Sequence, residues 1–128
     1  MKKRLVACIF LFASTGLAMA VSPWAGTYQG TATDKVNNVK VGSPYTIQLA
    51  VFNDTTTSAF TYIGTALSSV SLGSINSKGV FLLNTVNTSG TFSVAGTLTK
   101  SGASYKVVYT YPTQIGTATG TALLTKQH

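Results

Sequence analysis

The chain has 128 residues, of which 45% are hydrophobic and only 9% charged, and its nine Lys and Arg outnumber its two acidic residues. One Cys and one His are too few for a disulfide framework or for a zinc site built from those ligands. We therefore expect one small basic domain without a disulfide, a metal or a cofactor.

The first twenty residues have the pattern of a secretory signal peptide. Lys2-Lys3-Arg4 is a basic start, residues 5–13 are apolar, and Ala18-Met19-Ala20 is a small-x-small cleavage signal. Cleavage after Ala20 would remove Cys8 and leave residues 21–128 as a single domain. The sequence thus predicts an exported bacterial protein, either periplasmic or extracellular.

The part after the predicted cleavage carries six Lys, two Asp and no Arg. Its lysines are scattered and no arginine is present to pair with phosphate, so we expect no nucleic-acid partner. No apolar run in this part approaches the roughly 20 residues of a membrane helix, so we expect no stable membrane insertion after cleavage.

Eight short segments alternate apolar and polar residues with period two, the pattern of half-buried β-strands. They cover about residues 24–33, 45–52, 59–67, 69–75, 80–86, 92–98, 105–111 and 117–126. Short turns join most of them. The pattern predicts an all-β fold, an eight-stranded antiparallel up-and-down meander closed into a small barrel, with a β-sandwich as the alternative.

A repeated motif favours closure. The pattern G-T-x-x-G-T-A occurs at residues 26–32 in the first strand and at 116–122 in the last, and these strands are neighbours only in a closed meander. Glycine inside a strand often marks a tight bend or a close backbone approach. The alternative is that the repeat reflects composition, because Gly-Thr also occurs elsewhere.

The longest connection covers residues 34–43, which we expect to form a loop over one barrel end. A small hairpin centred on Asn37-Asn38 is the alternative. Strand parity places this connection at the same end as the turns near 68, 87–90 and 112–116, and Trp24 and Asp54 at the other end.

Catalytic groups are scarce, so we expect no enzyme and no catalytic residues. Glycosidase carboxyl groups lie roughly 5 to 10 Å apart, whereas the predicted ends hold Asp34 and Asp54 roughly 25 Å apart. Both aspartates stand in turn-like contexts, where Asp commonly bonds its own backbone. His128 is the last residue and is a poor candidate for the base of a Ser-His-Asp triad.

Tyrosines are the best candidates for binding. Tyr105, Tyr109 and Tyr111 share one face of the seventh strand, which parity directs inward, and Tyr28 and Tyr45 are expected to join them. An eight-stranded barrel has room for side chains or one small ligand, and phenols combine an apolar ring with a polar group. Tyr28, Tyr105, Tyr109 and Tyr111 are therefore the predicted ligand residues. Alternatively, these are core tyrosines whose hydroxyls reach water at the rim.

The start of the predicted domain, Pro23-Trp24-Ala25-Gly26-Thr27-Tyr28, resembles the calycin group of lipocalin-like and avidin-like barrels. The resemblance implies a small barrel with a cavity for a small molecule, in which Trp24 plugs one end. Ser22 stands where the lipocalin signature has Gly, and the avidin-like biotin sites use several Trp where this chain has one. The resemblance therefore implies no particular ligand.

Together these features predict a small exported, non-enzymatic binding protein that holds a partly apolar ligand in or at the mouth of a barrel. The alternative is a structural or adhesive extracellular protein that self-associates or binds a cell surface through its strands.

Overall fold

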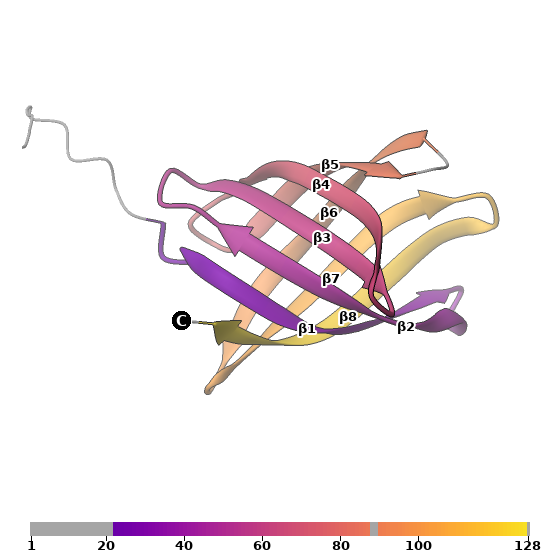
Figure 1. Cartoon of the computed structure of the whole chain (residues 1–128), viewed down its shortest axis with the longest axis horizontal. Helices are drawn as coiled ribbons and strands as arrows, with labels where there is room; N and C mark the ends of the chain where they lie inside the picture. Colours follow the sequence, from indigo (N-terminus) through magenta and orange to yellow (C-terminus); the bar gives the residue numbers. More distant parts are fainter. Residues whose placement is uncertain (1–21, 88–89, 128) are drawn as a thin grey trace, which may run out of the picture.

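The computed structural model describes residues 22–87 and 90–127, which form eight antiparallel β-strands and no helix. Each strand pairs with the next, and β8 pairs with β1, so the sheet closes into a barrel (Figure 1). The strands are β1 (Gly26–Val36), β2 (Val39–Val51), β3 (Thr56–Ile63), β4 (Ala66–Ile75), β5 (Val80–Asn87), β6 (Gly90–Ser101), β7 (Ser104–Thr113) and β8 (Gly116–Gln127). The closed meander predicted from the sequence is confirmed, and the sandwich alternative is wrong.

The predicted signal peptide, residues 1–20, lies outside the described residues, so its cleavage stays a prediction. Over the described part of the chain, no helix is long and apolar enough to cross a membrane.

The two G-T-x-x-G-T-A segments lie on the paired strands β1 and β8, but the register offsets them. The two motifs are paired with each other only at their last residues, Ala32 and Ala122. The expected close backbone approach occurs at Gly30, where an added Cβ would lie 2.1 Å from the Leu123 carbonyl oxygen. The motif thus marks neighbouring strands without marking their register.

Residues 34–43 do not form the expected loop. β1 continues to Val36, β2 begins at Val39, and the two asparagines between them have positive φ angles of 51° and 64°. Two-residue hairpins need positive φ at both central positions, which asparagine tolerates better than most residues. The hairpin alternative, centred on Asn37 and Asn38, is therefore confirmed.

The third strand also differs from its predicted range. It covers Thr56–Ile63 instead of 59–67, and the turn to β4 comes at Gly64-Thr65 instead of near residue 68. Gly64 has a φ of +63°, which glycine adopts without steric cost. Ser68 lies inside β4 as an extra residue, between the pairs that join Thr61 to Ser69 and Tyr62 to Leu67.

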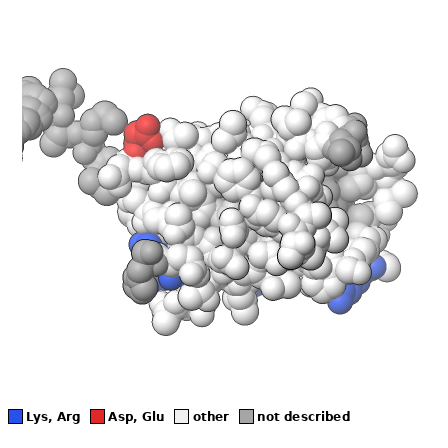
Figure 2. All heavy atoms as spheres, in the orientation of Figure 1, with Lys and Arg blue, Asp and Glu red and all other residues white. Residues whose placement is uncertain are grey.

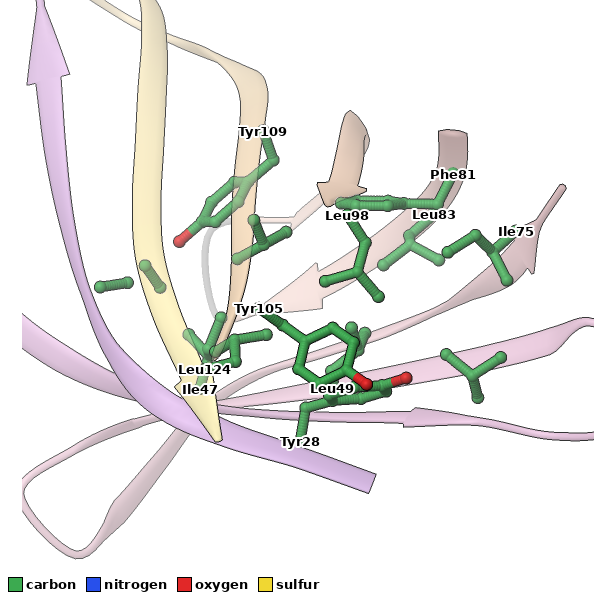
Figure 3. Packing of buried hydrophobic residues seen from close by; sticks show 14 of the residues in the cluster. Tyr28, Ile47, Leu49, Ile75, Phe81, Leu83, Leu98, Tyr105, Tyr109 and Leu124 are labelled. Carbon is green, nitrogen blue, oxygen red and sulfur yellow. The ribbon is translucent and has the colours of Figure 1, made fainter. Parts of the chain in front are cut away.

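The two ends of the barrel differ in how they are filled. At the end where β1 begins, which we call the closed end, the largest fully buried side chains pack together (Figure 3). They include Tyr28, Ile75, Leu98 and Leu124. The opposite end, which we call the open end, carries the hairpin turns at 37–38, 64–65 and 114–115. Strand parity predicted this division of the turns.

The outer surface is divided by charge. No charged residue occurs in β3, β4 or β5, and outward apolar side chains such as Leu72, Leu82 and Val86 are more than half exposed. One face of the molecule is accordingly almost free of charge, with basic and acidic side chains only near its ends (Figure 2). The six lysines of the described residues belong to other strands and to a turn of the closed end.

Candidate ligand cavity

A cavity of about 460 Å³ occupies the barrel interior towards the open end. Its volume lies within the range of pockets that bind small molecules, about 300 to 1,000 Å³. Its deepest part is lined by buried apolar side chains, because alternate residues of every strand point inward. These are Ile47, Leu49, Phe81, Leu83, Val94 and Val107.

Two irregularities in strand pairing lie at the cavity. On β2, extra residues around Gly42 and Ser43 interrupt the register with β1, and on β4 the extra residue is Ser68. All three of these residues line the cavity. Bulges bend a strand and commonly occur at barrel rims and beside functional sites.

The polar centre of the cavity is Asp34, on β1, which is only 8% exposed. The Tyr45 hydroxyl, from β2, donates to Asp34 Oδ1 at 2.7 Å, and the Tyr111 hydroxyl, from β7, donates to Oδ2. The hydroxyls of Tyr45 and Tyr109 also hydrogen bond to each other. With Asp34 ionised, the protons run from Tyr109 to Tyr45 to Asp34, so every phenol has an acceptor.

Small residues on β8 allow this network to form. Gly120 lies between Tyr109 and Asp34 in the sheet, paired with both. A Cβ added at Gly120 would lie 2.3 Å from the Tyr109 ring, so that ring crosses directly over the glycine. Ala118, which has no exposed surface, lies in the same way between Tyr111 and Val36. β8 thus leaves space for two tyrosines of β7 to join the network, Tyr111 by bonding the Asp34 carboxyl group and Tyr109 by bonding the Tyr45 hydroxyl.

The three phenols of the network have raised pKa values. Burial is the main cause for Tyr45, Tyr109 and Tyr111, because it disfavours the charged phenolate. The neighbouring Tyr109 raises the pKa of Tyr45 further, and the Asp34 carboxyl group raises that of Tyr111. Tyrosine is already neutral at physiological pH, and burial moves the ionisation of these side chains further into the alkaline range.

Hydroxyl pairs occupy the opposite wall, on β3 to β5. Thr61 and Ser69 are hydrogen bonded at 2.5 Å, and the buried pair of Ser71 and Thr85 at 2.7 Å. Each pair satisfies polar atoms that would otherwise be costly to bury. The cavity therefore has an apolar floor and polar groups on two sides.

An aromatic surface adjoins the carboxyl group. The Tyr109 and Tyr111 rings stack with centroids 6.3 Å apart, and the Phe92 ring centroid lies 5.7 Å from that of Tyr111. All three side chains line the cavity. The rings and the carboxyl group together form one side of the mouth.

The structure separates the four predicted ligand residues. Tyr109 and Tyr111 line the cavity, whereas Tyr28 and Tyr105 do not. Tyr28 and Tyr105 pack edge to face at the closed end, with centroids 4.9 Å apart (Figure 3). The ligand role thus stays a prediction for the first pair, while the second pair belongs to the core.

Asp34 and Tyr45 were not among the predicted site residues. Asp34 was expected in a turn, bonded to its own backbone, but it lies inside β1 and bonds tyrosines. The signal for it was parity, because Asp34 follows Tyr28 and Ala32 on the inward face once the strand extends past residue 33. Asp54 behaves as expected: the Thr56 amide donates to its Oδ1 at 3.0 Å, and the hydrogen bonds from Thr56 lower its pKa.

Trp24 lies at the closed end, as expected. Its Nε1 donates to the Ser77 carbonyl at 3.1 Å, and its ring packs so close to Gly79 that a Cβ there would lie 3.0 Å away. Its carbonyl accepts the Tyr28 hydroxyl at 2.6 Å. These contacts hold Trp24 across this end of the barrel, and its role as a plug stays a prediction.

Metal ligands are not grouped in the part of the chain that the structure describes, where no three His, Cys, Asp or Glu side chains come together. The oxygen-rich side of the cavity therefore consists of one carboxyl group and several hydroxyls.

Comparison with known proteins gives a likeness of fold. No protein-family model matches the sequence, and no curated protein matches it. Among solved structures, the chain is similar to a double mutant of the vaccine antigen transferrin-binding protein B from Haemophilus parasuis Hp5, with a TM-score of 0.54 and 13% identity. The match covers 83% of this chain and 26% of that chain. The likeness supports the calycin-like barrel architecture, and at this identity it shows the fold alone.

Proposed function

We propose that this protein is a binding protein that holds a small, partly apolar ligand in the cavity at the open end of its barrel. The observation that carries the proposal is the cavity itself, about 460 Å³ with an apolar floor and a polar mouth. A barrel whose only task was to fold would gain stability by filling this space, as the closed end does.

Binding would rest on two contributions. Burial of apolar ligand surface against residues such as Leu83 and Val107 contributes about 25 cal/mol per Å² removed from water. Hydrogen bonds at the mouth, from the network of Asp34 and its tyrosines, would fix the orientation of the ligand.

We also propose that the protein is exported and has no enzymatic activity. The leader-like sequence of residues 1–20 supports export to the periplasm or the cell exterior. The chemistry of the cavity supports a binding role, since its phenols are neutral hydrogen-bonding groups engaged in the Asp34 network and its hydroxyl groups are paired with one another.

A structural or adhesive role is the second candidate. Closure pairs β1 with β8, which leaves no free edge strand over the described residues for strand-to-strand association. What favours this candidate is the uncharged outer surface of β3 to β5, with its exposed Leu72 and Leu82. The structural neighbour is named for binding transferrin, which adds a protein to the partners considered.

The cavity can be tested with N-phenyl-1-naphthylamine, a neutral apolar dye whose fluorescence rises in an apolar site. We expect saturable binding with one dye per chain. Ala59 lines the cavity, so Ala59→Trp should fill part of it and reduce dye binding. Ala95→Trp is the matched control, because Ala95 is exposed on β6 and its side chain does not line the cavity.

Circular dichroism and thermal unfolding should first establish that both variants are folded. A folded Ala59→Trp variant that binds dye as the wild type does, together with loss of binding in Ala95→Trp, would place the site on the outer surface and refute the proposal. Native mass spectrometry of the protein purified from its own host adds an independent reading, since it reports bound small molecules and self-association together.

A further inference from the structure

Asp34 poses an energetic problem that its partners solve only in part. Its carboxyl group is 8% exposed, and its partners are the neutral hydroxyls of Tyr45 and Tyr111. Burying a carboxylate without a counter-ion costs several kcal/mol, and neutral donors offset less of that cost than a cation does. An inward-facing Val or Leu at this position would avoid the cost.

No cationic side chain of the described residues lines the cavity. Lys35 follows Asp34 directly, but alternation along β1 places it on the outer face, where it is exposed. Lys40 is likewise exposed, on β2, the second strand of the same hairpin. The carboxyl group therefore faces a cavity that contains no positive charge of the protein's own.

The surroundings of Asp34 fit a positive charge in two further ways. A carboxylate has about four acceptor sites, of which the two phenols use two, so acceptors remain for a ligand. The Tyr111 hydroxyl is bonded to it, and the rings of Tyr109 and Phe92 lie beside the Tyr111 ring. The face of an aromatic ring attracts a cation. Because the phenol protons point towards Asp34 and its network, the oxygens left to a ligand are acceptors, which favour a donor.

We infer that the ligand is an organic cation, an amine or quaternary ammonium group on a small apolar body, with its charge held between Asp34 and the Tyr109 and Tyr111 rings. Its apolar part would lie on the floor formed by residues such as Leu83 and Val107. A bare metal ion fits less well, because one carboxyl group is too little for the hard cations that take six or more oxygen ligands.

This inference rests on the proposed function, and its test separates the two. Three indole compounds of similar size differ in charge: tryptamine is a cation, tryptophol is neutral and indole-3-propanoate is an anion. Their affinities are measured by displacement of N-phenyl-1-naphthylamine and by calorimetry at neutral pH. We expect tryptamine to bind about tenfold or more tighter than tryptophol, and the anion to bind weakest.

Asp34→Asn should bring the tryptamine affinity, measured by calorimetry, to that of tryptophol, and circular dichroism should establish that the variant is folded. Asp54→Asn is the matched control, because it makes the same charge change at the exposed turn of the other end and should leave the ranking intact. If Asp34→Asn does not fold, the affinities of the three compounds for the wild-type protein test the inference on their own.

Equal affinities for tryptamine and tryptophol, or a preference for tryptamine that survives in Asp34→Asn, would overturn the inference. Dye binding by the wild type in that case would leave the proposed function standing, with Asp34 acting only to brace the tyrosines. If neither the dye nor any indole compound binds, the proposed function falls as well.

Discussion

At the closed end, Tyr28 and Tyr105 pack against each other inside a filled core. At the open end, Tyr45, Tyr109 and Tyr111 surround a carboxyl group beside a cavity. Tyr105 and Tyr109 belong to the same face of the same strand and lie only four residues apart. The difference between the ends therefore comes from the neighbouring strands and not from the tyrosines themselves.

The neighbours differ in size along β8. Opposite Tyr105 stands Leu124, which fills the interior, whereas opposite Tyr109 stands Gly120, over which the ring folds. A large residue on β8 keeps the paired tyrosine in the core, and a small one lets the tyrosine ring extend over β8 towards β1. The comparison predicts that the closed end chiefly supports stability and the open end chiefly supports binding.

Tyr28→Ala should give the largest effect on stability. The side chain is 1% exposed, and removal of a large buried aromatic ring costs about 3 to 5 kcal/mol. The free energy of unfolding, from urea denaturation, measures it. Dye binding by the folded fraction should stay close to that of the wild type, because Tyr28 does not line the cavity.

Tyr109→Ala provides the contrast at the open end. Its ring borders the cavity, so the free energy of unfolding should fall by less than in Tyr28→Ala. The dye affinity should change, because Tyr109 lines the cavity. Equal losses of stability from the two variants would show that the ends are not energetically distinct.

Gly120→Ala should have an intermediate effect. The new Cβ would lie 2.3 Å from the Tyr109 ring and would displace it, and overpacking of this kind costs about 1 to 3 kcal/mol. Displacement of the ring should also reduce any preference for tryptamine. Thr119→Ala, an outward-facing neighbour on the same strand, serves as control and should change the unfolding free energy by less. A Gly120→Ala variant as stable as the wild type would contradict the crossing of the ring over β8.

The barrel could be predicted because period-two alternation is a local property of the sequence. Residues such as Ile47 and Leu49 show which side faces inward without knowledge of any partner strand. Turn positions were less certain, since Asn37 and Asn38 fit a loop or a hairpin and only the pairing of Val36 with Val39 decides between them.

The site could not be predicted in the same way, because it depends on register. Asp34 meets Tyr45 through a bulged pairing with β2, and meets Tyr111 across β8. Both relations join residues distant in the chain, and a shift of one residue would turn the side chains outward. The sequence did contain one signal, because alternation along the first strand directs Asp34 inward. The predicted strand ended at residue 33, so Asp34 was assigned to the following connection.

The effect of phenol ionisation on the free energy of unfolding should be the smallest of these effects under ordinary conditions, because it is absent near neutral pH and arises only at alkaline pH. The pKa values of Tyr45, Tyr109 and Tyr111 are raised by burial above the ordinary 10.0, and that of Tyr28 is raised to about 12. Above pH 10 the unfolded chain loses phenol protons that the folded chain retains. The folded state then binds more protons, so the free energy of unfolding must fall as the pH rises.

We therefore expect stability that does not depend on these phenols up to about pH 9 and a decline from pH 10 upward, measured by urea denaturation at a series of pH values. Tyr45→Phe should lower stability at neutral pH, because it removes a hydrogen bond to Asp34, yet make the alkaline decline shallower. Tyr28→Phe should do the same for the closed end. If near-ultraviolet titration of the folded protein showed every phenol ionising near pH 10, the burial of the Tyr28 hydroxyl and of the tyrosine hydroxyls around Asp34 would be refuted. A decline made shallower by only one of the two variants would identify the end that keeps its phenols from water.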